Sequence, residues 1–583
     1  MNTGKGGMAR IRQIEIKNFR GIQAFTWQPA PGLNCLIGPG DSGKSTVLDA
    51  IDLCLGARRN LALTDADFYC LDVETPIQIT ITLGELEDSL KSLEAYGLYL
   101  RGFDATTGIV EDEPDNEGDT VLTVRLTVEG DLEPSWTLVS ERAEAQGQSR
   151  NLTWADRLRL APTRIGVMAS YHLGWRRGSV LNRVSEERAD ASAALAKAAR
   201  EARAAFGTEA EEQLRETLQI VAGTARDLGI GLDGELKALL DAHSVSFSGG
   251  TIALHDSDGV PLRGLGTGST RLLTAGLQRR ASAQSPMILV DELEFGLEPH
   301  RIIRLLDSLG AKETSLPLQT FMTTHSPVAV RELSANQLFV MRQCDHQHHA
   351  LPAAASGDAQ GAIRLYPEAF LAHSVIVCEG ASEVGLVRGL DRYRTENGFD
   401  AIAAQGLVLI DSRGGDPDRP LCRAAVFQNL GYRVAVLRDD DKKPNADVES
   451  AFVQAGGKVI AWRDGRALED ELFLSLSHQA VSRLLDHAIE LHGQDLIDNH
   501  IKSITQNASD LNRMRAEIEN DGLGSARRTT LGHAARTSNN SWFKSVTRME
   551  TVAHDVVGPD LVNADEGFRA IVDNLFGWIS GGG

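Results

Sequence analysis

The first residues with recognisable chemistry form the run Gly38-Pro39-Gly40-Asp41-Ser42-Gly43-Lys44-Ser45. Glycines in such a loop let backbone N–H groups wrap phosphates, while a lysine reaches the outer phosphates and a serine ligates Mg²⁺. The run lies between an expected strand, LNCLIG, and an expected helix, TVLDAIDLCLG, which is the context that a nucleotide loop requires. The sequence therefore predicts an ATP site that includes Gly38, Gly40, Gly43, Lys44, Ser45 and Thr46.

A second part of this site is predicted where four apolar residues precede two acids, Met287-Ile288-Leu289-Val290-Asp291-Glu292. Asp291 would hold Mg²⁺ through its water shell, and Glu292 would polarise the attacking water. His325 ends the next expected strand, LQTFMTTHSP, and is a candidate contact of the γ-phosphate. The alternative for His325 is a capping residue at a strand end.

These elements, in this order, resemble an ABC-type ATPase of the RecF and SMC group. The resemblance covers about residues 8–345 and implies a signature loop, which binds the γ-phosphate of ATP held by a second subunit. Leu265-Gly266-Thr267-Gly268-Ser269 is the candidate loop, with Gly268 and Ser269 as its nucleotide contacts. Gly266 stands where that motif usually has Ser. The resemblance implies ATP-dependent head-to-head dimerisation.

Clustered acids follow two apolar runs in the last third of the chain. Glu379 ends SVIVCEG, Glu383 follows four residues later, and YRVAVLRDDD ends in Asp439 and Asp441. The C-terminal ends of parallel strands share one sheet edge, so these carboxylates are expected to converge there. They repel one another unless cations bind, and Mg²⁺ or Mn²⁺ is the natural occupant. Two such ions can clamp a phosphodiester; the alternative is a solvated acidic rim.

This EG…DxD arrangement resembles a Toprim domain, the metal-binding fold of topoisomerases, primases and some nucleases. A Toprim unit after an ABC-type ATPase is similar to the OLD (overcoming lysogenization defect) family, which includes the nuclease subunit of the Gabija anti-phage system. The resemblance implies an ATP-binding, Mg²⁺- or Mn²⁺-dependent DNA endonuclease. Further site residues follow from it: Glu469 with Glu471 as its competitor, and Lys544 with Lys502 as the alternative.

The elements that position these residues predict an α/β architecture in two parts. Residues 1–180 and 244–350 would form an ABC-type P-loop ATPase domain, and residues 368–583 a Toprim domain with helical C-terminal elements. Residues 181–243 are rich in Ala, Glu and Arg and contain no Pro. They predict an inserted helical dimerisation arm, or simply two packed helices.

Composition limits the class of protein. The 583 residues are 42% hydrophobic and 24% charged, as in globular proteins, and no run of 18 apolar residues predicts a membrane span. The six cysteines form no CxxC pair and no secretory signal is visible, so a reducing cytoplasm is expected. The net charge of −21 argues against coating nucleic acid by bulk electrostatics. An enzyme that neutralises phosphates with metal ions and a few basic groups remains compatible with it.

The expected partners are DNA and further copies of the chain, as a homodimer or homotetramer, with a helicase-like partner if the system is of the Gabija type. One alternative is a non-cleaving ATPase sensor or scaffold. Another is different Toprim chemistry, but no Tyr lies beyond Tyr432 to act as a topoisomerase nucleophile. The cysteines also provide no zinc module of the kind that a primase usually has.

Overall fold

The protein is described from a computed structural model of the chain, which forms two compact units: Met1–Cys35 with Ser45–Thr324, and Leu36–Lys44 with His325–Gly583. The predicted helical arm, residues 181–243, lies almost wholly outside the described residues, so its dimerisation role stays a prediction. The structure describes residues 9–58, 61–114, 118–166, 169–173, 179–181, 197–198, 200–202, 205, 214–220, 254–259, 261–281, 286–313, 318–344, 347–463, 465–520, 522–537 and 540–581.

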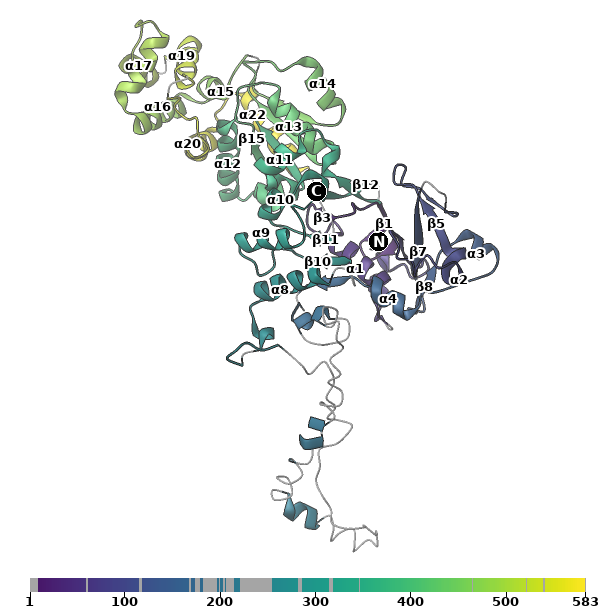
Figure 1. Cartoon of the computed structure of the whole chain (residues 1–583). Coiled ribbons are helices and arrows are strands. Elements are labelled where there is room, and N and C mark those ends of the chain that lie inside the picture. Colours follow the sequence, from purple (N-terminus) through teal and green to yellow (C-terminus); the bar gives the residue numbers. More distant parts are fainter. Residues whose placement is uncertain are drawn as a thin grey trace. The chain divides into compact units, whose positions relative to one another are not determined.

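An antiparallel sheet opens the first unit (Figure 1). Its strands lie in the order β6-β5-β7-β4-β1-β2, with β8 paired to β7. The alternating run at the N-terminus forms β1, where Ile14 and Ile16 are fully buried, as the alternation predicts. Ile11 is also fully buried, but it lies beyond a register shift between Ile11 and Gln13. The strand bounds are β1 Arg10–Phe19, β2 Ile22–Trp27, β4 Ile77–Gly84, β5 Leu100–Phe103, β6 Val110–Glu111, β7 Asp119–Val128 and β8 Pro134–Leu138.

Parallel strands form the second part of this unit. β10 (Met287–Val290) pairs in parallel with β9 (Thr163–Ile165) and with β11 (Gln319–Thr323). β3 (Leu33–Ile37) lies beside β11. All four residues of β10 are buried, because helices cover parallel sheets on both faces. The α-helices in the described residues of this unit are α1 Lys44–Leu55, α2 Leu93–Tyr96, α3 Glu141–Ala145, α4 Trp154–Leu160, α8 Thr267–Arg280 and α9 Pro299–Ser308.

The second unit is built on a parallel sheet in the order β15-β14-β16-β17. Successive residues of its strands point to opposite faces. Ile376 and Leu437 belong to the core that is shared with α12 and the C-terminal helices, whereas their neighbours Val375 and Val436 are buried but lie outside that core. The sheet elements are β14 Ser374–Cys378, α12 Ala381–Glu396, β15 Leu407–Asp411, α13 Arg419–Gln428, β16 Arg433–Arg438, α14 Ala446–Gln454 and β17 Lys458–Ala461.

Helices make up the rest of the second unit after β17, as predicted. They complete the core on one face of the sheet, where Trp542, Phe543 and Phe568 are fully buried. Ser477 and Asp565 cap α16 and α22 by accepting hydrogen bonds from main-chain N–H groups. The helices are α15 Leu468–Ser475, α16 His478–His492, α17 Gln494–Ile504, α18 Leu511–Glu519, α19 Ser525–Ala535, α20 Val546–Val552, α21 Gly558–Asp560 and α22 Glu566–Ser580.

The second unit also contains α10 (Pro327–Glu332), the hairpin β12 (Leu338–Cys344) and β13 (Gln347–Pro352), and α11 (Ala359–Leu365). The prediction assigned residues up to 350 to the ATPase domain, whereas the two units divide at Thr324. Among the described residues, no helix combines the length and the apolar character that crossing a membrane requires.

Candidate functional site

The predicted nucleotide loop lies between β3 and α1, as the sequence indicates. Gly38 and Gly43 have φ angles of 136° and 85°, which are strained for residues with a side chain. The buried Lys44 ammonium folds over the loop and donates to the carbonyl oxygens of Gly38 at 3.1 Å and Pro39 at 2.5 Å. Gly40 lies in the loop and Thr46 in the first turn of α1, where it is half-buried. A loop and lysine in this arrangement suit phosphate binding.

The acids after β10 form a second cluster, within the first unit. Asp291 Oδ1 accepts hydrogen bonds from the hydroxyls of Ser45 at 2.9 Å and Thr323 at 2.7 Å. The Arg164 guanidinium lies 3.3 Å from Asp291 Oδ2. Glu292 is exposed and has a left-handed φ of 46°, held by its N–H bond to Thr323 Oγ1 at 2.8 Å. The structure thus brings Ser45 and Asp291 together, as an Mg²⁺–nucleotide site requires.

The candidate signature loop leads into α8, which begins at Thr267. Arg271 on α8 is almost fully buried and donates to the carbonyl oxygen of Asp291 at 2.8 Å, so this helix is fixed to the segment that carries the acids. Ser269 Oγ accepts a hydrogen bond from Arg301 at 3.2 Å. A Cβ on Gly268 would lie 2.4 Å from the carbonyl oxygen of Gly296, so only glycine fits there. His325 follows β11 and is exposed.

In the second unit, the predicted carboxylates do converge at the C-terminal edge of the parallel sheet. Glu379 follows β14, Glu383 lies in the first turn of α12, and Asp439 follows β16. Glu379 Oε2 accepts the Asp439 N–H at 2.9 Å, and Asp439 Oδ1 accepts the N–H of Leu468, at the start of α15, at 2.9 Å. Backbone donors therefore fix the orientation of these carboxylates.

Burial and mutual repulsion dominate the electrostatics of this cluster. Burial, together with the carboxylates of Glu469 and Glu379, raises the pKa of Glu383 to about 8. Burial and the same neighbours raise the pKa of Asp439 well above its ordinary value. The pKa values of Glu379 and Glu469 are also raised, in both cases chiefly by burial. Such a set of raised values marks a site where the nearby positive charge does not offset burial and repulsion between the carboxylates.

The structure separates Glu469 from its competitor Glu471. Glu471 is fully buried and paired with the guanidinium groups of Arg463 at 2.6 Å and Arg466 at 3.3 Å, and these contacts lower its pKa despite burial. Glu469 is also buried, but the charge of its carboxylate raises the pKa values of Glu383 and Asp439. Glu471 therefore ties the β17–α15 loop to α15, whereas Glu469 belongs to the carboxylate cluster.

Asp440 lies between the predicted ligands Asp439 and Asp441 in the sequence, but it pairs with basic side chains instead of joining the cluster. It is buried and accepts hydrogen bonds from Lys443 at 2.7 Å, Arg438 at 2.9 Å and the Gly465 N–H at 3.0 Å. Burial alone would raise its pKa, but these donors lower it to about 2. Asp440 is thus a structural carboxylate.

Basic residues approach the cluster from the C-terminal helices. Arg536, which the sequence analysis missed, lies 2.7 Å from Asp441 Oδ2 and 3.3 Å from Asp470 Oδ2. Lys544 is exposed, and its charge opposes the rise that burial causes in the pKa of Glu469. The alternative, Lys502, lies on α17 and is paired with Asp498 at 2.5 Å. No spacing in the sequence points to Arg536, because it follows α19 and lies 95 residues beyond Asp441 in the chain.

Within the described part of the chain, no three His, Cys, Asp or Glu side chains lie at metal-ligand spacing. The carboxylates are gathered, but they do not already surround a common point. The oxygen-only donor set still suits a hard divalent ion. One further buried acceptor, Asp470 Oδ1, has no hydrogen-bond partner.

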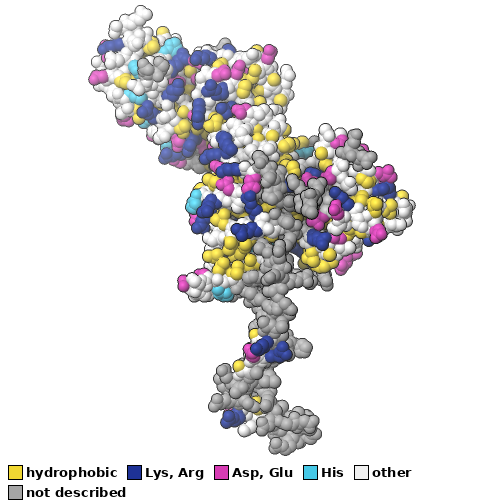
Figure 2. All heavy atoms as spheres, viewed as in Figure 1, with side chains coloured by type: hydrophobic (Ala, Val, Ile, Leu, Met, Phe, Trp, Pro, Cys, Tyr) yellow, Lys and Arg dark blue, Asp and Glu magenta, His cyan; other side chains and the backbone are white. Residues whose placement is uncertain are grey.

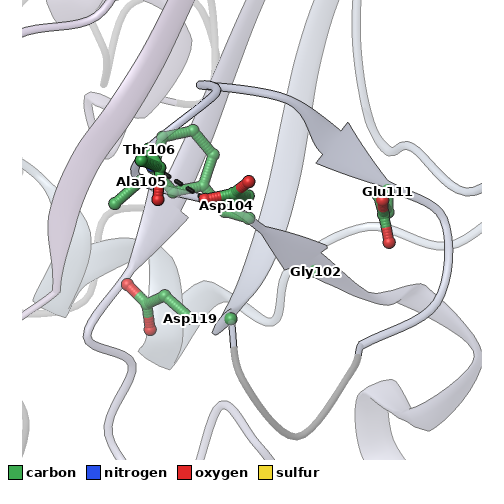
Figure 3. Close-up of a pocket in the computed structure, with 8 residues that line it drawn as sticks. Gly102, Asp104, Ala105, Thr106, Glu111 and Asp119 are labelled. Atoms are coloured by element: carbon green, nitrogen blue, oxygen red, sulfur yellow. Dashed lines mark hydrogen bonds between the residues drawn. The ribbon is translucent and has the colours of Figure 1, made fainter.

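A pocket of about 360 Å³ lies elsewhere, in the first unit, between the β5–β6 hairpin and the start of β7 (Figure 3). Three of its lining residues are acidic, but two of these acids have local roles. Asp104 accepts the Thr106 N–H at 2.7 Å, and Asp119 pairs with Arg12 at 2.7 Å. None of the predicted site residues lines this pocket.

Comparison with known proteins identifies the first part of the chain. The sequence model of a family described as "AAA domain, putative AbiEii toxin, Type IV TA system" matches residues 33–331, more than half of the chain. The chain belongs to this AAA-domain family. The match spans the phosphate loop, Asp291 and Glu292, and it confirms that residues 33–331 contain an ATPase domain.

Individual curated proteins match the chain over shorter stretches. The DNA replication and repair protein RecF of Chlorobium phaeovibrioides is 26% identical over 112 residues, which is 17% of this chain and 30% of that protein. The OLD nuclease of Thermus scotoductus is 31% identical over 116 residues, 19% of this chain and 21% of that protein. The chain thus spans less than a third of the length of each of these relatives.

Among solved structures, an SMC head bound to the C-winged helix domain of ScpA is similar to this AAA-family chain. The similarity covers 58% of this chain and 96% of that one, at 16% identity and a TM-score of 0.33.

Proposed function

We propose that this chain is an ATP-binding, divalent-metal-dependent DNA nuclease whose second unit is a Toprim domain. The observation that carries the proposal is the convergence of Glu379, Glu383, Asp439 and Glu469 at one sheet edge, where burial and repulsion raise all four pKa values. At neutral pH, carboxyl groups with raised pKa values tend to hold protons, and a divalent cation that binds between them displaces these protons. The partial similarity to an OLD nuclease supports the same reading.

The donor set fits Mg²⁺ or Mn²⁺. All four groups are carboxylates, and hard divalent ions prefer oxygen ligands. Asp441 is the fifth candidate ligand, and it would exchange its contact with Arg536 for the ion. Two ions at this site, and one with ATP at Ser45 and Asp291, are the cofactors that we propose.

The chain's own residues prepare the cleavage of a phosphodiester. Bound divalent ions lower the pKa of water and offset charge on the phosphate. Glu379 and Asp439 are oriented in advance by the Asp439 and Leu468 N–H groups, so little reorganisation is needed on binding. Lys544 is exposed near Glu469 and would stabilise the charge that develops on the phosphate oxygens.

Nucleotide at the phosphate loop would regulate this activity. Lys44 and Ser45 would hold ATP, Asp291 its ion, and Glu292 the attacking water. Gly268, Ser269 and His325 would contact the γ-phosphate, the first two across a homodimer. Lys44→Ala should therefore weaken ATP binding by more than about tenfold, and it should change the response of DNA cleavage to ATP. A role in anti-phage defence or DNA processing, as a homodimer or homotetramer with a possible helicase-like partner, extends the same proposal.

A non-cleaving ATPase that only binds DNA or a partner protein is the second candidate function. It is favoured by one observation: the described carboxylates do not lie at metal-ligand spacing. It offers no reason for gathering four carboxyl groups, two of them buried and two half-buried, without cations.

Cleavage of a linear DNA duplex by the full chain distinguishes the two functions. If the chain is a nuclease, cleavage requires Mg²⁺ or Mn²⁺ and stops when EDTA is added. The Glu469→Gln variant should fold like wild type but cleave the duplex much more slowly. The non-cleaving ATPase would bind the duplex and leave it intact with either ion, with or without ATP.

A further inference from the structure

Three arginines with no part in the site described so far gather around Tyr366 in the second unit. The Arg423 guanidinium lies 5.3 Å from the centre of the Tyr366 ring. Burial raises the pKa of the Tyr366 hydroxyl, and the charge of Asp411 adds to this rise. The charges of Arg423, Arg413 and Arg419 oppose it. The same hydroxyl donates to the carbonyl oxygen of Asp411, the last residue of β15, at 2.7 Å. The three cations therefore share one small region at the end of β15.

No described carboxylate forms an ion pair with any of these three arginines, although acids surround them in the sequence. The nearby acids bind main-chain donors instead. Asp411 accepts the Arg413 N–H at 2.7 Å, Asp416 accepts the Asp418 N–H at 3.0 Å, and Asp418 accepts the Asn445 N–H at 2.6 Å. The acids therefore stabilise the loop through its main chain, and the three guanidinium groups can bind a different anion.

Main-chain bonds place this loop beside the carboxylate cluster. The Gly414 N–H donates to the carbonyl oxygen of Glu379 at 2.8 Å, and the Ser412 N–H donates to that of Cys378 at 3.0 Å. Arg419 donates to the Gly414 carbonyl oxygen at 2.8 Å, which brings its guanidinium back over the loop. Arg413 and Arg419 are both exposed. The arginines thus lie next to the strand end that carries Glu379.

Two features show that the loop is held in an unfavourable conformation. Arg413 has a left-handed φ of 64°, which costs about 1 kcal/mol in a residue with a side chain. Ser412 is almost fully buried and its hydroxyl oxygen has no hydrogen-bond partner. Figure 2 shows Lys and Arg side chains gathered over the part of the second unit that Figure 1 labels α11 and α12. Such local basic surface is what a chain with a net charge of −21 needs in order to hold a polyanion.

We propose that Arg413, Arg419 and Arg423 form a phosphate-binding subsite for the DNA strand, one that holds a phosphate flanking the phosphate that is cut. Cleavage of the neighbouring phosphate rests on the proposed nuclease function, whereas DNA binding by the three arginines does not depend on it. Guanidinium groups suit phosphate because their planar fork donates two parallel hydrogen bonds. The subsite would fix the strand across the sheet edge, where the carboxylates alone would repel it.

DNA binding by the full chain in EDTA tests the subsite apart from cleavage. Fluorescence anisotropy with a labelled oligonucleotide is measured over a range of salt concentrations for wild type, Arg413→Ala and Arg413→Ala/Arg419→Ala. Arg513→Ala is the matched control, because Arg513 is an exposed arginine on α18 of the same unit that is paired with Glu517 at 3.2 Å. We expect each subsite substitution to weaken binding roughly 3- to 10-fold and to lower the salt slope by about 1.

The outcomes are separable. Weaker binding and a smaller salt slope in the double variant, with Arg513→Ala unchanged, support the subsite even if wild type cuts no DNA under any condition. Only the nuclease proposal then fails. Equal affinity and an equal salt slope for wild type and the double variant would overturn the subsite, as would wild type that binds no DNA. Arg413→Lys keeps the charge, and its affinity should lie between those of wild type and Arg413→Ala.

Discussion

The main-chain N–H of Asp439 donates to Oε2 of Glu379 at 2.9 Å, so the residue that follows β16 and the residue that follows β14 hold each other. The two predicted acidic motifs are therefore joined by a backbone contact and not only by proximity. A glutamine at position 379 could keep this acceptor, whereas an alanine would remove it. Amide substitutions are accordingly the sharper probes of charge at this site.

Glu383→Gln should leave the protein at least as stable as wild type in EDTA. The Glu383 carboxyl is buried with a pKa of about 8, so at neutral pH it is largely protonated and an amide replaces it at little cost. The Gly380 N–H, which donates to Glu383 Oε2 at 2.9 Å, can bond to the amide oxygen instead. Thermal unfolding in EDTA checks stability, and a large fall in melting temperature would show that Glu383 has a structural role.

The same variant should lose the stabilisation that Mg²⁺ or Mn²⁺ gives wild type, since a ligand that binds only the folded state raises its melting temperature. Asp447→Asn is the control, because Asp447 is exposed on α14 of the same unit. An equal metal-induced shift in Glu383→Gln and wild type would place the ion elsewhere.

Glu469→Gln and Glu471→Gln should behave in opposite ways, although the two residues are neighbours on α15. Glu471→Gln leaves Arg463 and Arg466 without their buried partner and should lower the free energy of unfolding by about 3 kcal/mol. Glu469→Gln removes a carboxylate whose pKa burial has raised, so its stability should match or exceed that of wild type. Urea unfolding followed by tryptophan fluorescence measures both, and equal losses would contradict the separation.

The sequence could predict the cluster but not this separation. Apolar runs that end in acids mark the ends of parallel strands, and that geometry alone brings Glu379, Glu383 and Asp439 together. Residues 469 and 471 lie about 200° apart around one helix, and nothing local states which face meets the sheet edge. The positions of Arg536 and Lys544 were still harder to predict from the sequence, because only the packing of the C-terminal helices determines where these residues lie.

The strands and the phosphate loop were predictable for a similar reason. Each depends on a local pattern: alternation in β1, unbroken apolar residues in β10, and glycines at the left-handed positions 38 and 43. The arginine subsite depends instead on which donors occupy Asp411, Asp416 and Asp418. In the sequence, that loop reads only as alternating charges.

Gly532→Ala should destabilise the second unit and displace Arg536 from the acids. A Cβ at position 532 would lie 2.9 Å from the Asp470 Cα, so α19 must move away from α15, at a cost of about 1–3 kcal/mol. Gly577→Ala in α22 is the matched control, because its Cβ would meet nothing within 4 Å and alanine favours the helix by up to about 1 kcal/mol. Urea midpoints that shift in the same direction would refute this packing.

His554 should make the stability of the second unit depend on pH. Hydrogen bonds to Asp555 at 2.5 Å and to Glu396 at 2.8 Å raise its pKa above the ordinary value, although burial and the charge of Arg392 oppose the shift. A raised histidine pKa stabilises the fold below the ordinary value of about 6.5, and the effect is lost as pH rises through the folded-state value. Because the partners are half exposed, the difference between wild type and His554→Gln should be at most about 1 kcal/mol at pH 5.5.

Urea midpoints of these two proteins at pH 5.5 and 8.5 measure the effect. The gap between them should narrow at pH 8.5, when the imidazole is neutral. A gap that widens with pH would mean that the neutral ring, not the ion pairs, links α12 to the segment after α20.

The most direct test of the account is the conversion of supercoiled plasmid by the full chain with Mg²⁺ or Mn²⁺, comparing wild type, Asp439→Asn and Asp447→Asn. Asp439 lies within the carboxylate cluster, whereas Asp447 is an exposed aspartate of the same unit. The account predicts nicked or linear product from wild type and Asp447→Asn, and a rate lower by roughly 100-fold or more for Asp439→Asn. Equal cleavage by Asp439→Asn and wild type would contradict the assignment of the chemistry to this sheet edge.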